Sequence, residues 1–573
     1  MNEALTIKTE RVDDIPLLQA QMQRMGLVEL LDKHFPTHGN RVGLSLGWVT
    51  SLWLTHVLSQ ADHRMNHVQS WVEQRLETLQ GCSQATLEVR DLSDDRLADV
   101  LRDLSDDERW REFEQDLTRQ VVRVYDLRSN TVRLDSTTAS SYGAVSEDGL
   151  LQLGHSKDHR PDLPQLKVML ATLDPLGMPL ATEVVAGQRA DDPLYLPAIA
   201  RVRTCLNQPG LLYVGDCKMA ALDTRASIQA HGDYYLCPLS AVQVPAAVLA
   251  QQVEAARASG QSLMRVERTQ ADGQIRCIAQ GYEQVEIITV QLDGVACTWT
   301  ERRLPVQSMA AKFSAEQALH TRLKQARQAL SELVVRRQGK AVLAERTEVE
   351  QAVADTLAHF RVEGLLLVTV HEQVQEQAVR AYRERPATRR IVRQFTITSQ
   401  VQTEALCKAS EQLGWRVYAT NHSAEQLPLT QAVEAYRDEF LVERTFGRLK
   451  GHPLSLSPMY VERDDHATGL VRLLSIALRV LTLLEFVVRR HLAELGASLA
   501  GLYAGNPKRA TTKPTTERLL EAFQGIFLTI LVEPYQTRRH LTALSALQQR
   551  VLALLEFSPT LYSHLCEDSS EPP

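Results

Sequence analysis

The chain has 573 residues, of which 44% are hydrophobic and 23% charged, and it carries a formal net charge of −7 at pH 7. This length is enough for two to four domains with at least one large hydrophobic core, and the composition is ordinary for a soluble globular protein. The negative balance excludes a uniformly basic nucleic-acid-binding chain, although it is compatible with a local basic channel.

The cysteines and the most apolar segments favour a cytoplasmic protein. No two of the eight cysteines have the CxxC spacing, so neither a zinc ribbon nor a redox motif is supported and reduced thiols are expected. The first residues, MNEALTIKTERVDDIP, include acids and no apolar run, so they do not predict a signal peptide. Residues 470–488 are strongly apolar but contain Arg472, Arg479 and Glu485, which are costly in lipid; a buried helix is expected there.

Residues 1–128 are predicted to form a helical N-terminal domain, and residues 129–237 the first part of an α/β core. The segment LGWVTSLWLTHVLSQ repeats apolar residues at helical spacing. The pattern changes at Thr131, where TVRLDSTTAS alternates and is rich in Val, Leu and Thr, as in a strand. Further strand-like and helix-like segments then alternate up to residue 237, which indicates a mixed α/β sheet.

The second half of the chain is predicted to contain an insertion and a helical end. Residues 238–412 combine segments with the pattern of antiparallel strands and one long helix, and they are interpreted as a β-rich inserted subdomain. Residues 413–500 return to the core, and residues 501–573 are predicted to form a helical C-terminal tail. The predicted fold class is therefore α/β.

Three acidic residues stand out by their positions. Asp135 lies inside the first predicted core strand, and Asp216 ends the segment LLYVGD. Ligands of α/β sheets usually bind at strand ends, and grouped buried carboxylates are costly unless a cation compensates them. A third carboxylate, Glu443, lies on a predicted helix. Two Asp and one Glu can hold a pair of Mg²⁺ ions about 3.5–4 Å apart, the arrangement used in phosphodiester chemistry.

The segments LDSTTAS, VGDCKMAA and YRDEFLVERTFGRLK resemble the three catalytic blocks of DDE transposases from bacterial insertion sequences. The resemblance is to the branch with the YREK signature, in the insertion-sequence-four-like superfamily, and covers residues 15–530. It implies an RNase H-like catalytic core with a β-rich insertion before the catalytic Glu. The order here is the same: two strand aspartates, an insertion and a helical glutamate.

Tyr436, Glu443 and Lys450 match the signature residue by residue, but Glu439 stands where the signature has Arg. On one ideal helix, steps of seven residues keep the three matching residues within about 40° of one face. Glu439 and Glu443 are like charges four residues apart, which is mildly destabilising. This departure makes Glu439 a rival metal ligand.

The resemblance implies a two-metal mechanism. Asp135, Asp216 and Glu443 would hold two Mg²⁺ ions, for which Mn²⁺ can substitute; water would cut the element's ends, and the freed 3′-OH would attack target DNA. The implied partners are double-stranded DNA, namely terminal inverted repeats and target DNA, and a second copy in a homodimer. Residues 1–128 would bind DNA ends or dimerise, in a bacterial, nucleoid-associated cytoplasmic protein. Phosphate contacts are expected from Tyr436, Arg448, Lys450, Lys157 and Arg160.

Two alternatives remain open at this point. The missing signature Arg would suit an impaired or domesticated transposase that only binds DNA ends. The carboxylates would also suit a nuclease that never joins strands.

Overall fold

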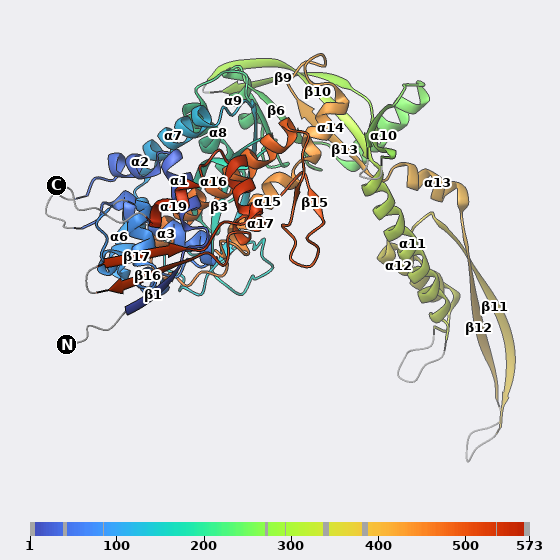
Figure 1. Cartoon of the computed structure of the whole chain (residues 1–573). Coiled ribbons are helices and arrows are strands. Elements are labelled where there is room, and N and C mark those ends of the chain that lie inside the picture. The colour runs from blue at the N-terminus through green and yellow to red at the C-terminus, as the bar shows by residue number, and fades with distance from the viewer. Residues whose placement is uncertain are drawn as a thin grey trace. The chain divides into compact units, whose positions relative to one another are not determined.

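In the computed structural model, the chain folds into two compact units (Figure 1). The first unit is formed by Met1–Cys237, Thr289–Trp299 and Glu434–Pro573, and the second by Pro238–Ile288 and Thr300–Val433. The described residues are 6–37, 43–83, 85–269, 273–292, 294–335, 343–380, 388–533 and 536–566.

The N-terminal part of the first unit is helical, as predicted. Its central helix, α3 (Leu46–Gln60), is buried along most of its length. Ser45 caps this helix, because its Oγ accepts a hydrogen bond from the Trp48 N–H at 3.4 Å. The other helices are α1 (Ile15–Arg24), α2 (Leu27–His34), α4 (Met65–Glu73), α5 (Leu76–Ser83), α6 (Asp94–Leu104) and α7 (Asp107–Val124), with a 3₁₀ turn at Val89–Leu92.

A mixed sheet forms the middle of the first unit, with the strand order β4-β3-β2-β5-β6. β2 pairs antiparallel with β3 and parallel with β5. Every residue of β3 is buried, so this strand lies inside the hydrophobic core. The predicted mixed α/β class is therefore confirmed. The elements are β2 (Thr131–Ser140), β3 (Gln165–Leu173), β4 (Met178–Ala186), the 3₁₀ turn Asp192–Leu194, α8 (Tyr195–Leu206), β5 (Leu212–Gly215), α9 (Leu222–Ala230) and β6 (Tyr234–Pro238).

A long helix, α16 (Asp464–Glu494), runs through the first unit and is buried along most of its length. Its internal charges are paired: Arg479 Nη2 lies 2.6 Å from Glu114 Oε1, and Arg472 Nη1 donates to the Leu104 carbonyl at 2.9 Å. The expectation of a buried helix is confirmed. Within the described part of the chain, no helix has the length and apolar character needed to cross a membrane.

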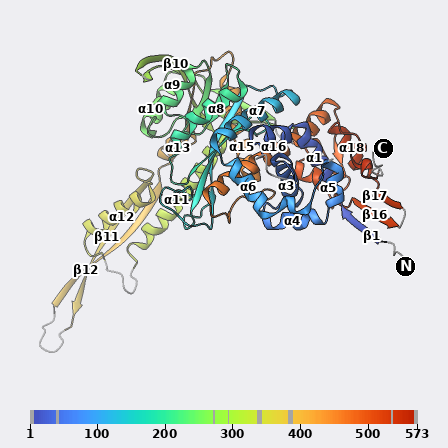
Figure 2. The same ribbon diagram turned by 90° about the vertical axis from the view of Figure 1, so that its left-hand side faces the viewer.

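The expectation of a wholly helical C-terminal tail is wrong. β16 (Phe527–Glu533) pairs with β17 (Gln536–Leu541) and with the N-terminal strand β1 (Thr6–Arg11), and the three lie side by side in Figure 2. Leu528 and Ile530 are buried at alternate positions, the period of a strand. The remaining elements are β14 (Leu499–Ala500), β15 (Ala510–Thr511), α17 (Thr516–Glu521), α18 (Ala546–Leu554), α19 (Thr560–Ser563) and a 3₁₀ turn at His564–Cys566.

The second unit contains an antiparallel sheet and a helix-covered hairpin. The strands have the order β13-β10-β8-β7, and β9 also pairs with β10. Of β9 and β10, the residues within Thr289–Trp299 belong to the first unit. The hairpin of β11 and β12 packs against α11 and α12 around one apolar cluster. The elements are α10 (Ala246–Ala258), β7 (Met264–Thr269), β8 (Ile275–Gly281), β9 (Gln284–Leu292), β10 (Val295–Ser308), α11 (Met309–Glu332), α12 (Arg346–Phe360), β11 (Leu366–Val379), β12 (Thr388–Val401), α13 (Thr403–Glu411) and β13 (Trp415–Thr420).

Candidate active site

Asp135 and Asp216 come together where the parallel pairing of β2 with β5 ends, Asp135 within β2 and Asp216 just after β5. Leu134 of β2 lies opposite Gly215 of β5, so the next residue on each strand is one of the two aspartates. Both aspartates line a cavity whose walls also include Tyr436, Glu439 and Val442. The convergence expected of the two strand aspartates is thus present in the structure.

The surroundings of Asp135 favour the protonated form of its carboxyl group. Burial, assisted by the nearby carboxylates of Asp216 and Glu439, raises the pKa of Asp135 to about 6. Two contacts oppose the rise: Lys157 Nζ lies 3.6 Å from Asp135 Oδ1, and the Ser136 N–H donates to the same oxygen at 2.7 Å. The negative charge of the site is therefore only partly compensated.

Tyr195, at the start of α8, holds Asp216 in place. Its hydroxyl donates a hydrogen bond to Asp216 Oδ1 at 2.6 Å, and the Lys218 N–H donates to the same oxygen at 2.8 Å. Burial raises the pKa of Tyr195 well above its usual range, so the phenol stays protonated and acts as a donor. Sequence reasoning missed Tyr195; the only signal was its place in the acidic stretch DDPLY, just before a helix.

A second charged pair lies beside Asp135. Asp191 accepts a hydrogen bond from Ser136 Oγ at 3.0 Å and forms an ion pair with Lys167 at 2.7 Å. Burial opposes ionisation of Asp191, but the Lys167 and Lys157 ammonium groups hold its pKa below the usual range. Lys157 Nζ also donates to the Ser136 carbonyl at 2.5 Å. Sequence reasoning missed Asp191 and Lys167, because nothing in the local pattern shows that they meet β2.

The helix expected over the signature segment is interrupted. Two residues separate the end of α14 (Leu429–Arg437) from the start of α15 (Phe440–Lys450). Across the junction, hydrogen bonds change from the i−4 to the i−3 carbonyl, as in the Leu441 N–H to Asp438 contact at 3.0 Å. The expectation of one ideal helix that carries the whole signature is therefore wrong.

Arg133, a buried residue of β2, gives the physical reason for the interruption. Its Nη2 donates to the Ala435 carbonyl at 2.6 Å. In a continuous α-helix this carbonyl would accept from the N–H of Glu439, which instead donates to the Tyr436 carbonyl at 3.1 Å. Arg133 is itself held by Asp174 through two contacts of 2.7 Å. The break is thus imposed by a tertiary contact.

Glu439, and not Glu443, lines the cavity with the two aspartates. The Glu443 N–H donates to the Glu439 carbonyl at 3.3 Å, so the two residues lie on successive turns. Glu443 is exposed to solvent, whereas Glu439 is half-buried and acts on the pKa of Asp135. The structure therefore offers two candidates for a third carboxylate, one turn apart.

Two of the bases expected to contact phosphates are engaged within the protein. Arg448 is buried, and its guanidinium contacts Glu517 at 2.7 Å and Glu485 at 2.6 Å. This position in an internal ion-pair cluster does not suit a side chain that has to reach DNA. Lys450 Nζ lies 2.5 Å from Asp158 Oδ1, and the lysine is half-buried.

The loop after β2 presents a more open group. Arg160 is partly exposed and pairs with Asp162 at 2.8 Å. Its guanidinium also contacts the side chain of Tyr142, which stacks on Tyr460 with ring centroids 5.3 Å apart. Both tyrosines are more than half exposed, so this group is accessible to a large ligand.

The carboxylates of the site suit a divalent cation chemically, but they do not form a complete coordination sphere. Carboxylate oxygens are the ligands that Mg²⁺ prefers. Burial, assisted by the carboxylates of Asp216 and Glu439, raises the pKa of Asp135 and so disfavours a negative charge that a cation would stabilise. Among the described residues, however, no group of three or more His, Cys, Asp or Glu is arranged to hold a metal ion. A third carboxylate would have to move toward the aspartate pair.

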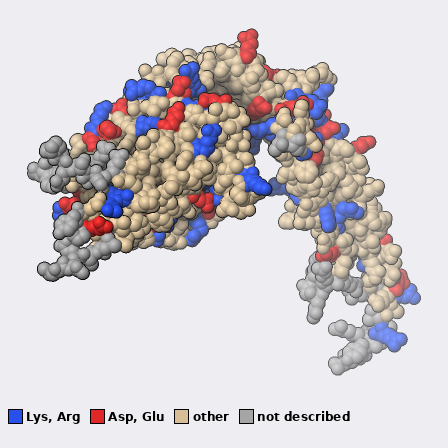
Figure 3. Space-filling view, in the orientation of Figure 1, with Lys and Arg blue, Asp and Glu red and all other residues tan. Residues whose placement is uncertain are grey.

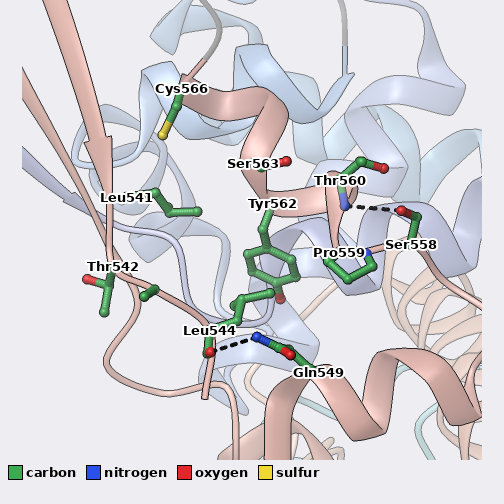
Figure 4. Close-up of a pocket in the computed structure, with 11 residues that line it drawn as sticks. Leu541, Thr542, Leu544, Gln549, Ser558, Pro559, Thr560, Tyr562, Ser563 and Cys566 are labelled. Atoms are coloured by element: carbon green, nitrogen blue, oxygen red, sulfur yellow. Dashed lines mark hydrogen bonds between the residues drawn. The ribbon is translucent and has the colours of Figure 1, made fainter. Parts of the chain in front are cut away.

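A larger cavity near the C-terminus lacks such chemistry (Figure 4). It has a volume of about 580 Å³, and none of its lining residues is charged at neutral pH. Tyr562 points into it in the close-up, and Gln549 Nε2 donates to the Leu544 carbonyl at 3.1 Å. The aspartate pair is therefore the better candidate for an active site.

Two protein-family models match the N-terminal helical part of the chain and the part that contains the aspartate pair. The model of the family "Transposase DDE domain" matches residues 126–480, and that of a domain of unknown function, DUF4277, matches residues 7–115. The chain also matches a solved synaptic complex of the piggyBac transposase with hairpin DNA, at 8% sequence identity and with 97% of this chain and 86% of that chain covered. The TM-score of 0.34 is too low to show a common fold. Comparison with curated proteins gives no match. Because the first model covers more than half of the sequence, the chain belongs to the DDE transposase family.

Proposed function

We propose that the protein is a DNA transposase that cuts the ends of its insertion sequence and joins the freed 3′-OH ends to target DNA. The observation that carries this proposal is the meeting of Asp135 and Asp216 where the parallel pairing of β2 with β5 ends, against the segment that bears Glu439. Membership of the DDE transposase family supports it.

The proposed metal ligands are Asp135, Asp216 and Glu443, with Glu439 as the alternative third ligand. Two Mg²⁺ ions, or Mn²⁺ in their place, would supply charge neutralisation and an activated water in such a site. The signature spacing supports Glu443, and proximity to Asp135 supports Glu439.

The chain's own side chains orient the carboxylates and the DNA in this proposal. Tyr195 fixes Asp216 through its hydrogen bond, and Lys157 neutralises part of the charge on Asp135. Lys450 and Arg160 are proposed to contact the DNA backbone, Lys450 after exchange of Asp158 for a phosphate. Lys157 is proposed to do the same beside the scissile bond. Arg448 is left out because it is buried and paired, and Tyr436 because it is buried in the wall of the cavity.

The same proposal includes the fold of the core, the branch of the family and the assembled state of the protein. The mixed sheet with its parallel centre supports an RNase H-like core, and the spacing of Tyr436, Glu443 and Lys450 supports the YREK-signature branch. A homodimer on paired ends, associated with the bacterial nucleoid, would follow from that branch.

The test is a cleavage assay on duplex DNA that carries the sequences flanking the coding region. We expect wild type to cut at the element ends with Mg²⁺ and Asp135→Asn to lose at least about 100-fold in rate, since each carboxylate helps to position charge at the reacting phosphate. Asp355→Asn, an exposed change on α12, is the matched control. Equal cutting by wild type and Asp135→Asn would refute the proposal.

Glu439 in the position of the signature Arg favours one alternative, a protein that only binds DNA ends. Wild type that shifts end DNA in a gel but does not cut it with Mg²⁺ or Mn²⁺ would support that alternative. A strand-transfer assay with pre-cut ends separates a transposase from a nuclease, because only the transposase joins the 3′-OH to target DNA.

A further inference from the structure

The hairpin of β11 and β12 forms a long two-stranded ribbon with two different faces (Figure 1). Fourteen residue pairs are in antiparallel register, from Leu366↔Val401 to Val379↔Thr388. The inner face packs on α11 and α12 through apolar residues, namely Val368, Val370, Phe395, Ile397 and Val401. Because strand residues alternate between faces, the positions in between form the outer face.

The outer face is exposed, polar and free of acids among its described side chains. In Leu366–Gln373 and Gln394–Val401 its residues are exposed and those of the inner face are partly or fully buried. In the far half, Val374–Ala378 are exposed on both faces and Val392 is partly buried. Gln373 lies opposite Gln394, and Thr369 lies opposite Thr398. These side chains are neutral hydrogen-bonding groups. The outer-face positions with described side chains are Leu367, Thr369, His371, Gln373, Gln375, Gln377, Val392, Gln394, Thr396, Thr398 and Gln400.

The acids of the ribbon lie on its inner face and are paired. Glu372 contacts Arg393 at 3.5 Å, and Glu376 contacts Arg389 at 3.3 Å. In sequence, residues 372–393 contain six Arg and three Glu, within a chain of net charge −7. Elsewhere, Lys and Arg are interspersed with Asp and Glu over the face seen in Figure 3. The described arginines of the strands, Arg389 and Arg393, therefore lie on the inner face beside these acids, and the open outer face carries no described carboxylate.

The dimensions of the ribbon match a DNA groove. Fourteen antiparallel residues extend about 44 Å, which exceeds the roughly 34 Å of one turn of B-DNA. Two strands about 4.8 Å apart, with side chains, fit a major groove about 12 Å wide, which accepts a two-stranded β-ribbon. Gln can pair with adenine through two hydrogen bonds, and Thr can contact base edges or the thymine methyl group.

We propose that the outer face of the β11–β12 ribbon lies in the major groove of duplex DNA and contacts base edges there. The inference rests on the proposed function only in taking DNA as the ligand. Acidic side chains on this face would repel the phosphates that line the groove, which accounts for their absence among its described positions. The surface is separate from the aspartate pair, which lies in the other unit.

The test measures binding of the full-length protein to duplex DNA from the element ends, by fluorescence anisotropy in buffer without divalent metal. Gln373→Glu combined with Gln394→Glu adds two carboxylates at directly opposed positions while keeping side-chain size. We expect Kd to rise roughly tenfold or more, and dimethyl sulfate protection of guanine N7 in the major groove to be lost. Gln251→Glu, on an exposed position of α10, is the matched control and should leave both unchanged.

The outcomes separate this inference from the proposed function. Unchanged affinity and unchanged N7 protection in a double variant that melts like wild type would overturn the inference. A change in oligomeric state by light scattering, without a change in DNA affinity, would also overturn it and assign the ribbon to a second copy of the chain. If wild type binds but never cuts, the proposed function fails while the ribbon result stands.

Discussion

A few directed contacts partly offset the desolvation cost of the half-buried Asp135 carboxylate. Lys157 lies 3.6 Å away, and a backbone N–H donates to the same oxygen, yet burial still raises the pKa to about 6. Glu439 contributes to this rise, because like charges disfavour ionisation. The charge of the site is thus set by three carboxylates and one nearby ammonium group.

The proposed third metal ligand can be tested by comparing Glu443→Gln with Glu439→Gln. We expect Glu443→Gln to lose at least about 100-fold in cleavage rate, because a metal ligand acts on the transition state. Glu439→Gln should keep cleavage, and in the metal-free protein the removal of a like charge should lower the pKa of Asp135. If Glu439→Gln loses cleavage and Glu443→Gln does not, the third ligand would instead be Glu439, one helical turn earlier.

Tyr195→Phe tests the positioning of Asp216. The variant loses one buried hydrogen bond, so we expect the free energy of unfolding to fall by only about 1 kcal/mol. Single-turnover cleavage should slow roughly tenfold, because Asp216 is no longer held in one orientation. Tyr213→Phe, a buried change on β5, serves as the control for packing. Equal cleavage rates for Tyr195→Phe and wild type would exclude a positioning role.

At the scale of elements, α16 connects the helical N-terminal part to the segment that carries the signature. Its Arg479 pairs with Glu114 of α7, and its Glu485 accepts contacts from Arg444, Arg448 and Arg489. Several cations around one buried acid bind α15 and α16 to each other. This arrangement fixes α15 beside β2.

Glu485→Gln is expected to destabilise the fold strongly. Three arginines would lose the single carboxylate that they share, and such a break costs about 3–5 kcal/mol. Chemical denaturation at neutral pH gives the free energy of unfolding. Glu521→Gln is the control, because its exposed pair with Arg518 is worth about 0–1 kcal/mol. Similar values for the two variants would contradict the assignment of a structural cluster.

His56 of α3 should make the protein less stable in mild acid. Burial lowers its pKa to about 4 in the folded state, against 6.5 for an ordinary histidine, so the unfolded chain takes up the proton first. Its contribution is fully present above pH 6.5 and is lost as the pH falls toward 4, by about 3 kcal/mol. Denaturation of wild type and His56→Gln at several pH values measures the difference. The control His359→Gln, exposed on α12, should follow wild type; if it does not, this explanation fails.

At the scale of the whole molecule, the two units differ in how their strands are supported. β2 and β3 lie inside a five-strand part of the sheet and are largely buried. Among the described strands, none pairs with the β11–β12 ribbon as a third strand, and the far half of the ribbon extends past the apolar cluster that supports the near half. Two-stranded ribbons are marginal by themselves, so a ligand should stabilise this one.

Hydrogen exchange measures that difference directly. Amides of residues 373–378 and 391–394 should exchange at least about 100-fold faster than those of β3, because opening the ribbon costs little apolar burial. Duplex DNA should slow exchange in the ribbon and leave β3 unchanged. Fast exchange with and without saturating DNA would argue against the ribbon as a DNA contact.

The order of elements was readable from the sequence where local pattern and burial agree. The helices up to residue 124 and the strand that bears Asp135 follow from apolar periodicity. The pattern failed at β16, because its partner β1 lies at the other end of the chain. Pairing over such a separation leaves no local trace.

The sequence by itself determined the family, the two strand aspartates and the signature segment, since residue identity and spacing are local properties. Only the tertiary structure decided which groups meet them. It brought Tyr195 to Asp216, broke the signature helix through Arg133, and turned Glu439 toward the aspartate pair. These outcomes depend on contacts between distant segments, whose energies a one-dimensional pattern does not contain.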